Sequence, residues 1–211
     1  MTIAQSLLAY LAAAGLLTLT PGVDTALVLR AATVEGRRPA AFGAVGIGLG
    51  CLVWGAAVAL GLGAVVTASP LAFTVLKWAG AAYLLYLGVG LVWKPRRTLA
   101  LDLASPSQAG AGGLETLRRG LLTNLLNPKV GVFYVSFLPQ FTPPGMPMAP
   151  WVFLLACIHV VLGLLWFTVL IAATIPIGRW MAKPGIVTVM DRLTGCVFIG
   201  FGARLALARR G

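Results

Sequence analysis

The stretch Leu19-Thr-Pro-Gly-Val-Asp24 decides the fold, together with its counterpart Leu126-Asn-Pro-Lys-Val-Gly131. Both read leucine, a small polar residue, proline, any residue and valine, and both lie inside long apolar runs. Because proline lacks a backbone donor and clashes with the preceding turn, we expect helices to break or kink at Pro21 and Pro128. Broken backbone at membrane depth is stable only where protein or water covers it. The two breaks are therefore predicted to lie inside the molecule.

The apolar runs around the breaks make up most of the chain. Of its 211 residues, 59% are hydrophobic and only 10% are charged, whereas an ordinary soluble domain has about 25% charged residues. This composition excludes a soluble enzyme and predicts an all-α, polytopic membrane protein. A bilayer is crossed by about 20 apolar residues in a helix. The six predicted transmembrane helices cover residues 3–30, 40–66, 71–93, 118–139, 150–176 and 186–208.

Lysine and arginine are distributed unevenly among the connections. Those after the first, third and fifth spans carry three, five and three of them, and those after the second and fourth carry none. Because cytoplasmic loops are enriched in Lys and Arg, the odd-numbered connections are predicted to be cytoplasmic and both termini periplasmic. Arg204, Arg209 and Arg210 oppose this orientation for the C-terminal tail. The net charge of +11 thus indicates membrane orientation and not nucleic-acid binding.

A second pair of motifs accompanies the two breaks. Each reads a basic residue, two residues, Gly, two residues, an aromatic, two residues and an aromatic: Lys77, Gly80, Tyr83 and Tyr86, then Arg192, Gly195, Phe198 and Phe201. Two matches in the same order predict a duplicated three-helix unit. Because each unit would cross the membrane an odd number of times, the second unit enters from the opposite side, and the repeat is inverted. We predict a single membrane domain, with repeat 1 at about residues 1–94, a flexible cytoplasmic loop at about 95–117 and repeat 2 at about 118–211.

Asp24 and Lys129 are opposite charges set deep in the two broken spans. A charge at the bilayer centre costs about 2.5–3.5 kcal/mol on insertion scales, so such residues usually belong to a transport pathway. An interfacial aspartate near Arg30 is the alternative for Asp24. We expect Asp24 and Lys129 to pair, or nearly pair, in the empty protein. On binding, Asp24 would take a substrate ammonium or a proton, and Lys129, with a half-helix N-terminus, would take a carboxylate.

Further residues are candidates for the same site or its surroundings. Pro21 and Pro128 are expected to face each other and line this site, together with Thr20 and Gly22 at the first break. Asn124 and Asn127 either bind substrate or join helices. Tyr83 and Tyr86 pack with a polar end or line a cavity, and Lys77 and Arg192 line it or reach lipid headgroups. We expect a hydrogen-bonded core histidine at His159. Close helix packing is expected at Gly43, Gly46 and Gly50.

These motifs resemble the LysE/RhtB amino-acid exporters over nearly the whole chain. The matching stretches are Thr20-Pro-Gly-Val-Asp24, the Lys77–Gly88 stripe, Gly120 to Lys129 with its Asn127-Pro-Lys129 element, and Phe137-Leu-Pro-Gln-Phe141. The resemblance implies efflux of amino acids or small derivatives across the bacterial inner membrane, driven by the proton or membrane-potential gradient. Asp24 favours the neutral, threonine/homoserine branch, although Val23 replaces the second proline of that branch's motif.

Two other classes of function are alternatives to a carrier. An intramembrane aspartyl protease needs two facing aspartates, but Asp191 is expected at a helix start beside Arg192. The chain also carries no HExxH or G-x-S-x-G motif. We therefore predict that the protein is not an enzyme, and that it needs no cofactor or metal. A metal-ion exporter or passive channel on the same scaffold is the alternative. The expected partners are a small amino-acid substrate and membrane lipids, and a homodimer is left open.

Overall fold

The computed structural model describes residues 2–68, 70–96, 112–181 and 183–207, and these residues contain helices but no strand. Most of the loop predicted at 95–117 and the last residues of the tail lie outside the described residues. The all-α class predicted from composition is confirmed for the part of the chain that is described.

The first half of the chain begins with a broken helix. α1 (Ile3–Leu19) starts at a capping box formed by Thr2 and Gln5, and α2 (Val23–Arg30) continues into a π-helical turn, η1 (Ala31–Glu35). The two parts meet at an angle of 53°. Gly36, with φ of 99°, then turns the chain. Two long helices follow, α3 (Arg37–Ala68) and α4 (Pro70–Trp93).

The second half repeats the order of a broken helix followed by long ones. Its elements are α5 (Gly113–Leu125), α6 (Pro128–Val132), the π-helical η2 (Phe133–Phe137), the 3-10 turn η3 (Leu138–Phe141), α7 (Met148–Ala172), α8 (Thr174–Met181) and α9 (Pro184–Leu207). α5 begins inside the segment predicted to be a flexible loop. Glu115 in its first turn favours helix formation there and pairs with Arg119, four residues on.

Within the described residues, three helical segments are long and apolar enough to cross a membrane: Arg37–Gly61, Met148–Ala172 and Gly185–Leu207. The bent pair Ile3–Leu19 and Val23–Glu35 adds a fourth if it counts as one span. The predicted fifth span ends earlier than expected, because the chain bends at Ala173 before α8 begins.

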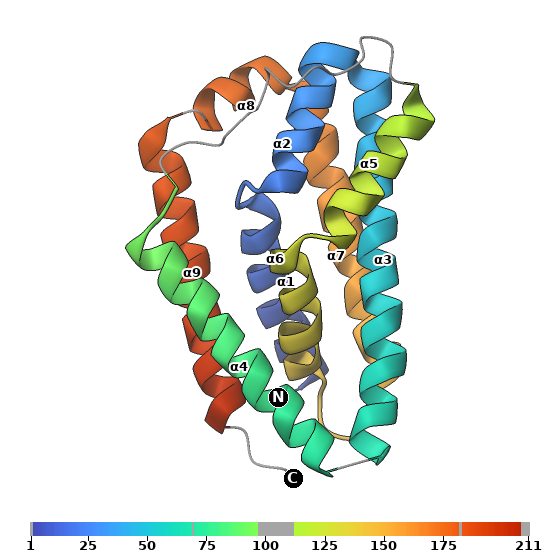
Figure 1. Ribbon diagram of the computed structural model, residues 1–211, viewed down its shortest axis with the longest axis vertical. Coiled ribbons are helices and arrows are strands. Elements are labelled where there is room, and N and C mark those ends of the chain that lie inside the picture. Colours follow the sequence, from blue (N-terminus) through green and yellow to red (C-terminus); the bar gives the residue numbers. More distant parts are fainter. Residues whose placement is uncertain (1, 69, 97–111, 182, 208–211) are drawn as a thin grey trace.

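Three close helix pairs organise the molecule (Figure 1). α3 packs against both α5 and α7, and α4 packs against α9. At the crossing of α4 and α9, a Cβ atom on Gly88 would lie 2.7 Å from the Gly195 carbonyl oxygen, and one on Gly195 would lie 2.6 Å from that of Gly88. At Gly46 in α3, a Cβ would overlap the Leu117 carbonyl of α5. The predicted close-packing role of Gly46 is confirmed.

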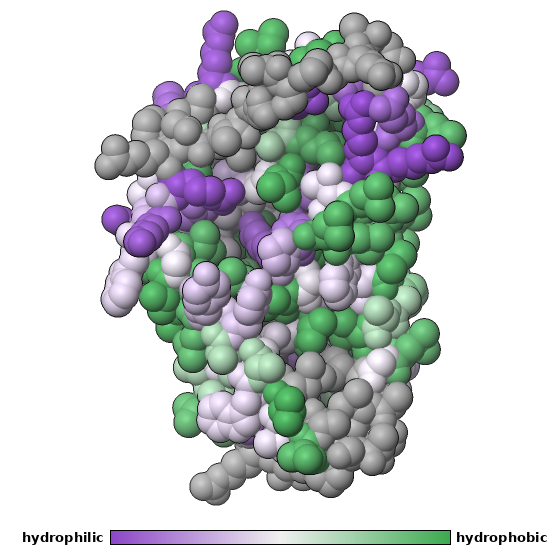
Figure 2. All heavy atoms as spheres, viewed as in Figure 1, coloured by the Kyte–Doolittle hydropathy of each residue, from purple (hydrophilic) through white to green (hydrophobic). Residues whose placement is uncertain are grey.

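The two ends of the molecule differ in character. Aromatic side chains are buried where α1, η2, η3 and α7 meet, and Tyr10 there donates a hydrogen bond to the Leu155 carbonyl oxygen at 2.8 Å. At the other end lie the connections between α2 and α3 and between α7 and α9, together with the start of α5 (Figure 1). Hydrophilic side chains are concentrated towards this second end (Figure 2). The connections after α2 and α7, which contain or adjoin basic residues, thus lie at one end of the molecule.

Candidate functional site

The first break lies between α1 and α2 at Thr20-Pro21-Gly22. The Thr20 backbone N–H donates to the Leu16 carbonyl at 3.0 Å, and its hydroxyl donates to the same oxygen at 2.7 Å. The α-helical hydrogen bonds stop here, because Pro21 has no N–H to give. The carbonyl groups of Thr20 and Pro21 are therefore available to partners from elsewhere in the chain.

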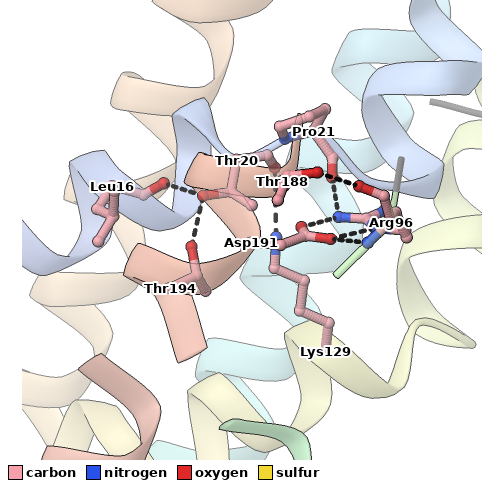
Figure 3. Close-up of polar contacts among 8 residues, drawn as sticks. All are labelled: Leu16, Thr20, Pro21, Arg96, Lys129, Thr188, Asp191 and Thr194. Carbon is pink, nitrogen blue, oxygen red and sulfur yellow. Dashed lines mark hydrogen bonds and ion pairs between the residues drawn. The ribbon is translucent and has the colours of Figure 1, made fainter. Parts of the chain in front are cut away.

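Two cationic side chains donate hydrogen bonds to these two consecutive carbonyl groups (Figure 3). Lys129 Nζ, from the second half of the chain, donates to the Thr20 carbonyl oxygen at 3.3 Å. Arg96 Nη2 donates to the Pro21 carbonyl oxygen at 2.6 Å. The end of α1 carries the negative pole of the helix dipole, so cations are favoured there. The first break is thus held by charged side chains that are distant in sequence.

Arg96 also makes an ion pair with Asp191 of α9. Its Nε and Nη2 atoms donate to the two carboxylate oxygens at 2.9 and 2.5 Å, and its backbone N–H donates at 2.9 Å. The Asp191 side chain is fully buried. Asp191 is thus a second acid, besides Asp24, that is buried inside a helical segment apolar enough to cross a membrane. Asp191 lies two turns inside α9, and the segment after α4 folds back to neutralise it.

The second break, between α5 and α6, is closed by its own residues. Asn127 caps α6: its side-chain oxygen accepts from the Lys129 backbone N–H at 3.0 Å. Its carbonyl oxygen accepts from Val130 and Gly131, both at 3.1 Å, and Pro128 has no N–H. The first-turn donors of α6 are already bonded, so the expected half-helix site for a carboxylate does not form at this terminus. Only the ammonium of Lys129 remains there to bind an anion.

The two breaks come together around one cavity of about 70 Å³, which has room for a few water molecules. It lies between the first break, α3, the second break and α7. Its polar lining includes Thr20, Asp24, Asn124, Asn127, Lys129 and His159, and its apolar walls include Leu17, Ile47, Val160, Leu164 and Phe167. Both the acid and the base singled out from the sequence therefore face the same space.

Asp24 is bound to Asn124 and not directly to Lys129. Asn124 Nδ2 donates to Asp24 Oδ2 at 2.9 Å, and no Asp24–Lys129 ion pair forms within the described residues. The other oxygens of the pair, Asp24 Oδ1 and Asn124 Oδ1, are buried and accept no hydrogen bond from the described residues. Buried acceptors without donors are unfavourable. Asp24 and Asn124 both line the cavity, and each keeps one acceptor atom without a donor from the described residues.

The α2 terminus supports the carboxylate of Asp24. Asp24 lies in the first turn of α2, and Gly22, which begins the helix, supplies no side-chain cap. The positive pole of the helix dipole favours a negative charge at this position. Gly22 is in extended backbone conformation, with φ of −148° and ψ of −166°, and a Cβ there would lie 4.0 Å from Lys129 Nζ. Gly22 thus leaves space beside the lysine.

The four residues expected to line a cavity do not lie together in the structure: Lys77, Tyr83, Tyr86 and Arg192. Tyr83 lines a second cavity of about 400 Å³, which Pro128 also lines, and Asn127 lines both cavities. Lys77 lies over the Trp78 ring and reaches the Ala206 carbonyl near the end of α9. Tyr86 and Arg192 are exposed and line neither of these two cavities. Only Tyr83 of the four is brought near a break.

His159 was expected to be a hydrogen-bonded core residue, and this is confirmed by its contact of 3.0 Å with the Tyr134 hydroxyl. It also lines the first cavity, as does Cys51, whose Sγ accepts from Asn124 at 3.5 Å. Neither residue was predicted to belong to the site. A lone polar residue on an apolar helix gives no sequence signal of what it faces. Groups of three or more His, Cys, Asp or Glu suited to a metal ion do not occur in the described ranges.

Comparisons with known proteins agree with the motifs. The family described as LysE type translocator matches residues 15–209. A Bacillus subtilis (strain 168) protein, the uncharacterized membrane protein YrhP, is 31% identical over 97% of this chain and its own full length. A homoserine/homoserine lactone efflux protein of Salmonella typhi is 33% identical, over 95% of this chain and 96% of its own.

A leucine efflux protein of Enterobacter sp. (strain 638) is 30% identical over 93% of both chains. No solved structure matches the chain. The family match extends from α1, before the first break, to the end of α9, so it contains every residue of the site described above. The chain therefore belongs to the LysE family, whose members are membrane transporters and not enzymes.

Proposed function

We propose that the protein exports neutral amino acids or their small derivatives across the bacterial inner membrane, driven by the proton or membrane-potential gradient. The relatives named for homoserine, homoserine lactone and leucine efflux support this substrate class. The observation that carries the proposal is the pair of unsatisfied acceptors, Asp24 Oδ1 and Asn124 Oδ1, in a cavity that Lys129 also lines.

In the proposed binding mode, the substrate ammonium donates to Asp24 and Asn124. An ammonium has three N–H donors, which suits two free acceptor oxygens at once. The substrate carboxylate binds Lys129, which releases the Thr20 carbonyl. The substrate side chain lies against the apolar wall that includes Ile47, Leu164 and Phe167, which favours a short apolar or weakly polar side chain.

We further propose that the chain crosses the membrane six times as two inverted three-helix repeats. The pairing of α3 with α7 and of α4 with α9 supports this arrangement, because each pair joins equivalent helices of the two halves. The basic residues at one end of the molecule support a cytoplasmic position for that end and periplasmic termini. Sites between inverted repeats are typical of secondary transporters.

Orientation is tested by cysteine labelling from outside whole cells. We expect a membrane-impermeant maleimide to label Ser69→Cys, in the connection before α4, and to leave Ser105→Cys unlabelled. Labelling of Ser105→Cys but not of Ser69→Cys would overturn the proposed orientation.

Function is tested with a panel of labelled amino acids in inverted membrane vesicles, with and without an uncoupler. The proposal predicts uptake of neutral amino acids into inverted vesicles, and loss of this uptake when the gradient is dissipated. Uptake that is unchanged by the uncoupler and only equilibrates the substrate would indicate a passive channel. Transport of a divalent metal ion, with no amino-acid uptake, would favour the metal-exporter alternative.

A further inference from the structure

Arg96 is the one cation of the described network that touches both the first break and α9. Its side chain is 39% exposed, whereas that of its partner Asp191 is fully buried. It follows the end of α4 by three residues and lies outside the first cavity. Neither the family motifs nor the cavity lining gives Arg96 a role, yet it donates more hydrogen bonds than an ion pair requires.

The arrangement of the Arg96 donors distinguishes two tasks. One is compensation of the buried Asp191 charge, which both Nε and Nη2 perform. The other is the contact of 2.6 Å from Nη2 to the Pro21 carbonyl oxygen. This second contact is not needed to neutralise an aspartate. It fixes the peptide unit that directly follows the Thr20 carbonyl, and the Thr20 carbonyl is the group that holds Lys129 Nζ at 3.3 Å.

The surroundings of Arg96 make this contact rigid. Thr188 of α9 donates a hydrogen bond to the Arg96 carbonyl at 3.2 Å, and the Arg96 backbone N–H is held by Asp191. On the other side, the hydroxyls of Thr20 and Thr194 are 2.6 Å apart, which joins the same break to α9 a second time. The α4–α9 pair is thus fastened to the break next to the lysine of the site (Figure 3).

We infer that Arg96 is a positioning residue for substrate binding: by holding the Pro21 carbonyl, it fixes the broken first span so that Thr20 presents Lys129 to the substrate carboxylate. This inference rests on the proposed function for its substrate. Arg96 does not touch the substrate. It acts through the consecutive carbonyl groups of Pro21 and Thr20, and it thereby links the position of the α4–α9 pair to substrate binding at Lys129.

Two variants separate the positioning contact from charge compensation. Arg96→Lys keeps the positive charge beside Asp191 but loses the planar fork that reaches the carboxylate and Pro21 together. Arg96→Gln with Asp191→Asn removes both charges, so no buried charge is left unpaired, and the shorter glutamine does not reach Pro21. Arg38→Lys, at an exposed arginine near the start of α3, is the matched control.

The first measurement is transport of the best amino acid from the panel. We expect both Arg96 variants to raise the half-saturation concentration about tenfold, with the maximal rate per inserted protein within threefold of wild type. Arg38→Lys should change neither value. A merely structural role would lower the amount of inserted protein without moving the half-saturation concentration. An unchanged half-saturation concentration in either Arg96 variant, or failure of both to accumulate in the membrane, would overturn the inference.

The second measurement needs no substrate. In a Cys157→Ser, Cys196→Ser background, Cys51 is the sole thiol of the chain, and it lines the same cavity as Thr20 and Lys129. We expect N-ethylmaleimide to alkylate Cys51 at least fivefold faster in both Arg96 variants, because the wall formed by the break loosens. An unchanged rate would contradict the inference. Faster alkylation in a protein that transports no amino acid would support the positioning role and refute the proposed function alone.

Discussion

The two breaks share a sequence pattern but are stabilised in different ways. The break at Pro21 depends on residues far away in the chain, since Lys129 and Arg96 hold its carbonyl groups. The break at Pro128 depends on its own neighbour, because Asn127 satisfies the first turn of α6. In the proposed binding mode, the first break would therefore respond to what Lys129 binds, whereas the second break, closed by its own cap, would hold Lys129 in place. The difference indicates that two stretches with the same sequence pattern can both interrupt a helix and still be stabilised by different partners.

The largest expected effects come from the charged residues that the two breaks bring to the cavity. Asp24→Asn and Lys129→Met should each reduce efflux at least a hundredfold, with near-normal insertion, because a substrate charge would enter the cavity without a countercharge. Vesicle transport, normalised to inserted protein by immunoblot, measures the effect. Near wild-type export by either variant would refute the proposed site. Failure of both to accumulate would make the two charges structural.

Replacing Pro21 and Pro128 in turn tests directly whether the two breaks are stabilised in different ways. Pro21→Ala supplies the missing N–H and allows the helix to continue through the break, so we expect a loss of at least tenfold in transport. Pro128→Ala should reduce transport less than threefold, because the Asn127 cap still ends α5 and starts α6. Equal losses in the two variants would mean that the breaks are equivalent.

The next smaller effect is expected from removal of the Asn127 cap. Asn127→Ala should lower stability by about 1 kcal/mol through loss of the cap. Asn127→Ser keeps an acceptor oxygen for the Lys129 backbone N–H and should retain most of this stability. The midpoint of thermal unfolding in detergent measures both variants. If serine is as destabilising as alanine, the cap does not explain the stability of the second break.

The smallest effect is expected at Gly22. Its extended backbone suits any residue, and a Cβ there would approach only Lys129 Nζ, at 4.0 Å. Gly22→Ala should therefore transport within about twofold of wild type. Gly22→Leu would fill the space that Lys129 uses, and we expect a loss of more than tenfold. Equal loss in alanine and leucine would show that the glycine is needed for its backbone and not for its small size.

Local rules are sufficient to predict much of this fold. Proline chemistry locates both breaks, and the spacing of Gly43, Gly46 and Gly50 indicates a close helix contact. The buried pair of Arg96 and Asp191 could not be predicted, because the residues are 95 positions apart and each resembles an ordinary residue at a span end. Asp24 and Lys129 were predicted to share a site, and they line one cavity.

The partners of the site residues were harder to predict than their place. Asn127 is a polar residue before a proline, which fits both a substrate ligand and a helix cap. Its capping role becomes visible only when the backbone of α6 is known. Lys129 was expected to pair, or nearly pair, with Asp24, whereas it donates to the Thr20 carbonyl oxygen, which the break at Pro21 leaves free. Irregular backbone creates acceptors that side-chain patterns do not reveal.

The most direct measurement compares an amino acid with its carboxamide, whose carboxylate is replaced by a neutral group. The best-transported amino acid of the panel and its amide are assayed in wild type, Lys129→Met and Asp24→Asn. We predict that Lys129→Met loses transport of the amino acid at least tenfold more than that of the amide, while Asp24→Asn loses both, because Asp24 binds the ammonium that the two share. Equal loss of both substrates in Lys129→Met would contradict the assignment of Lys129 to the carboxylate and, with it, the proposed binding mode.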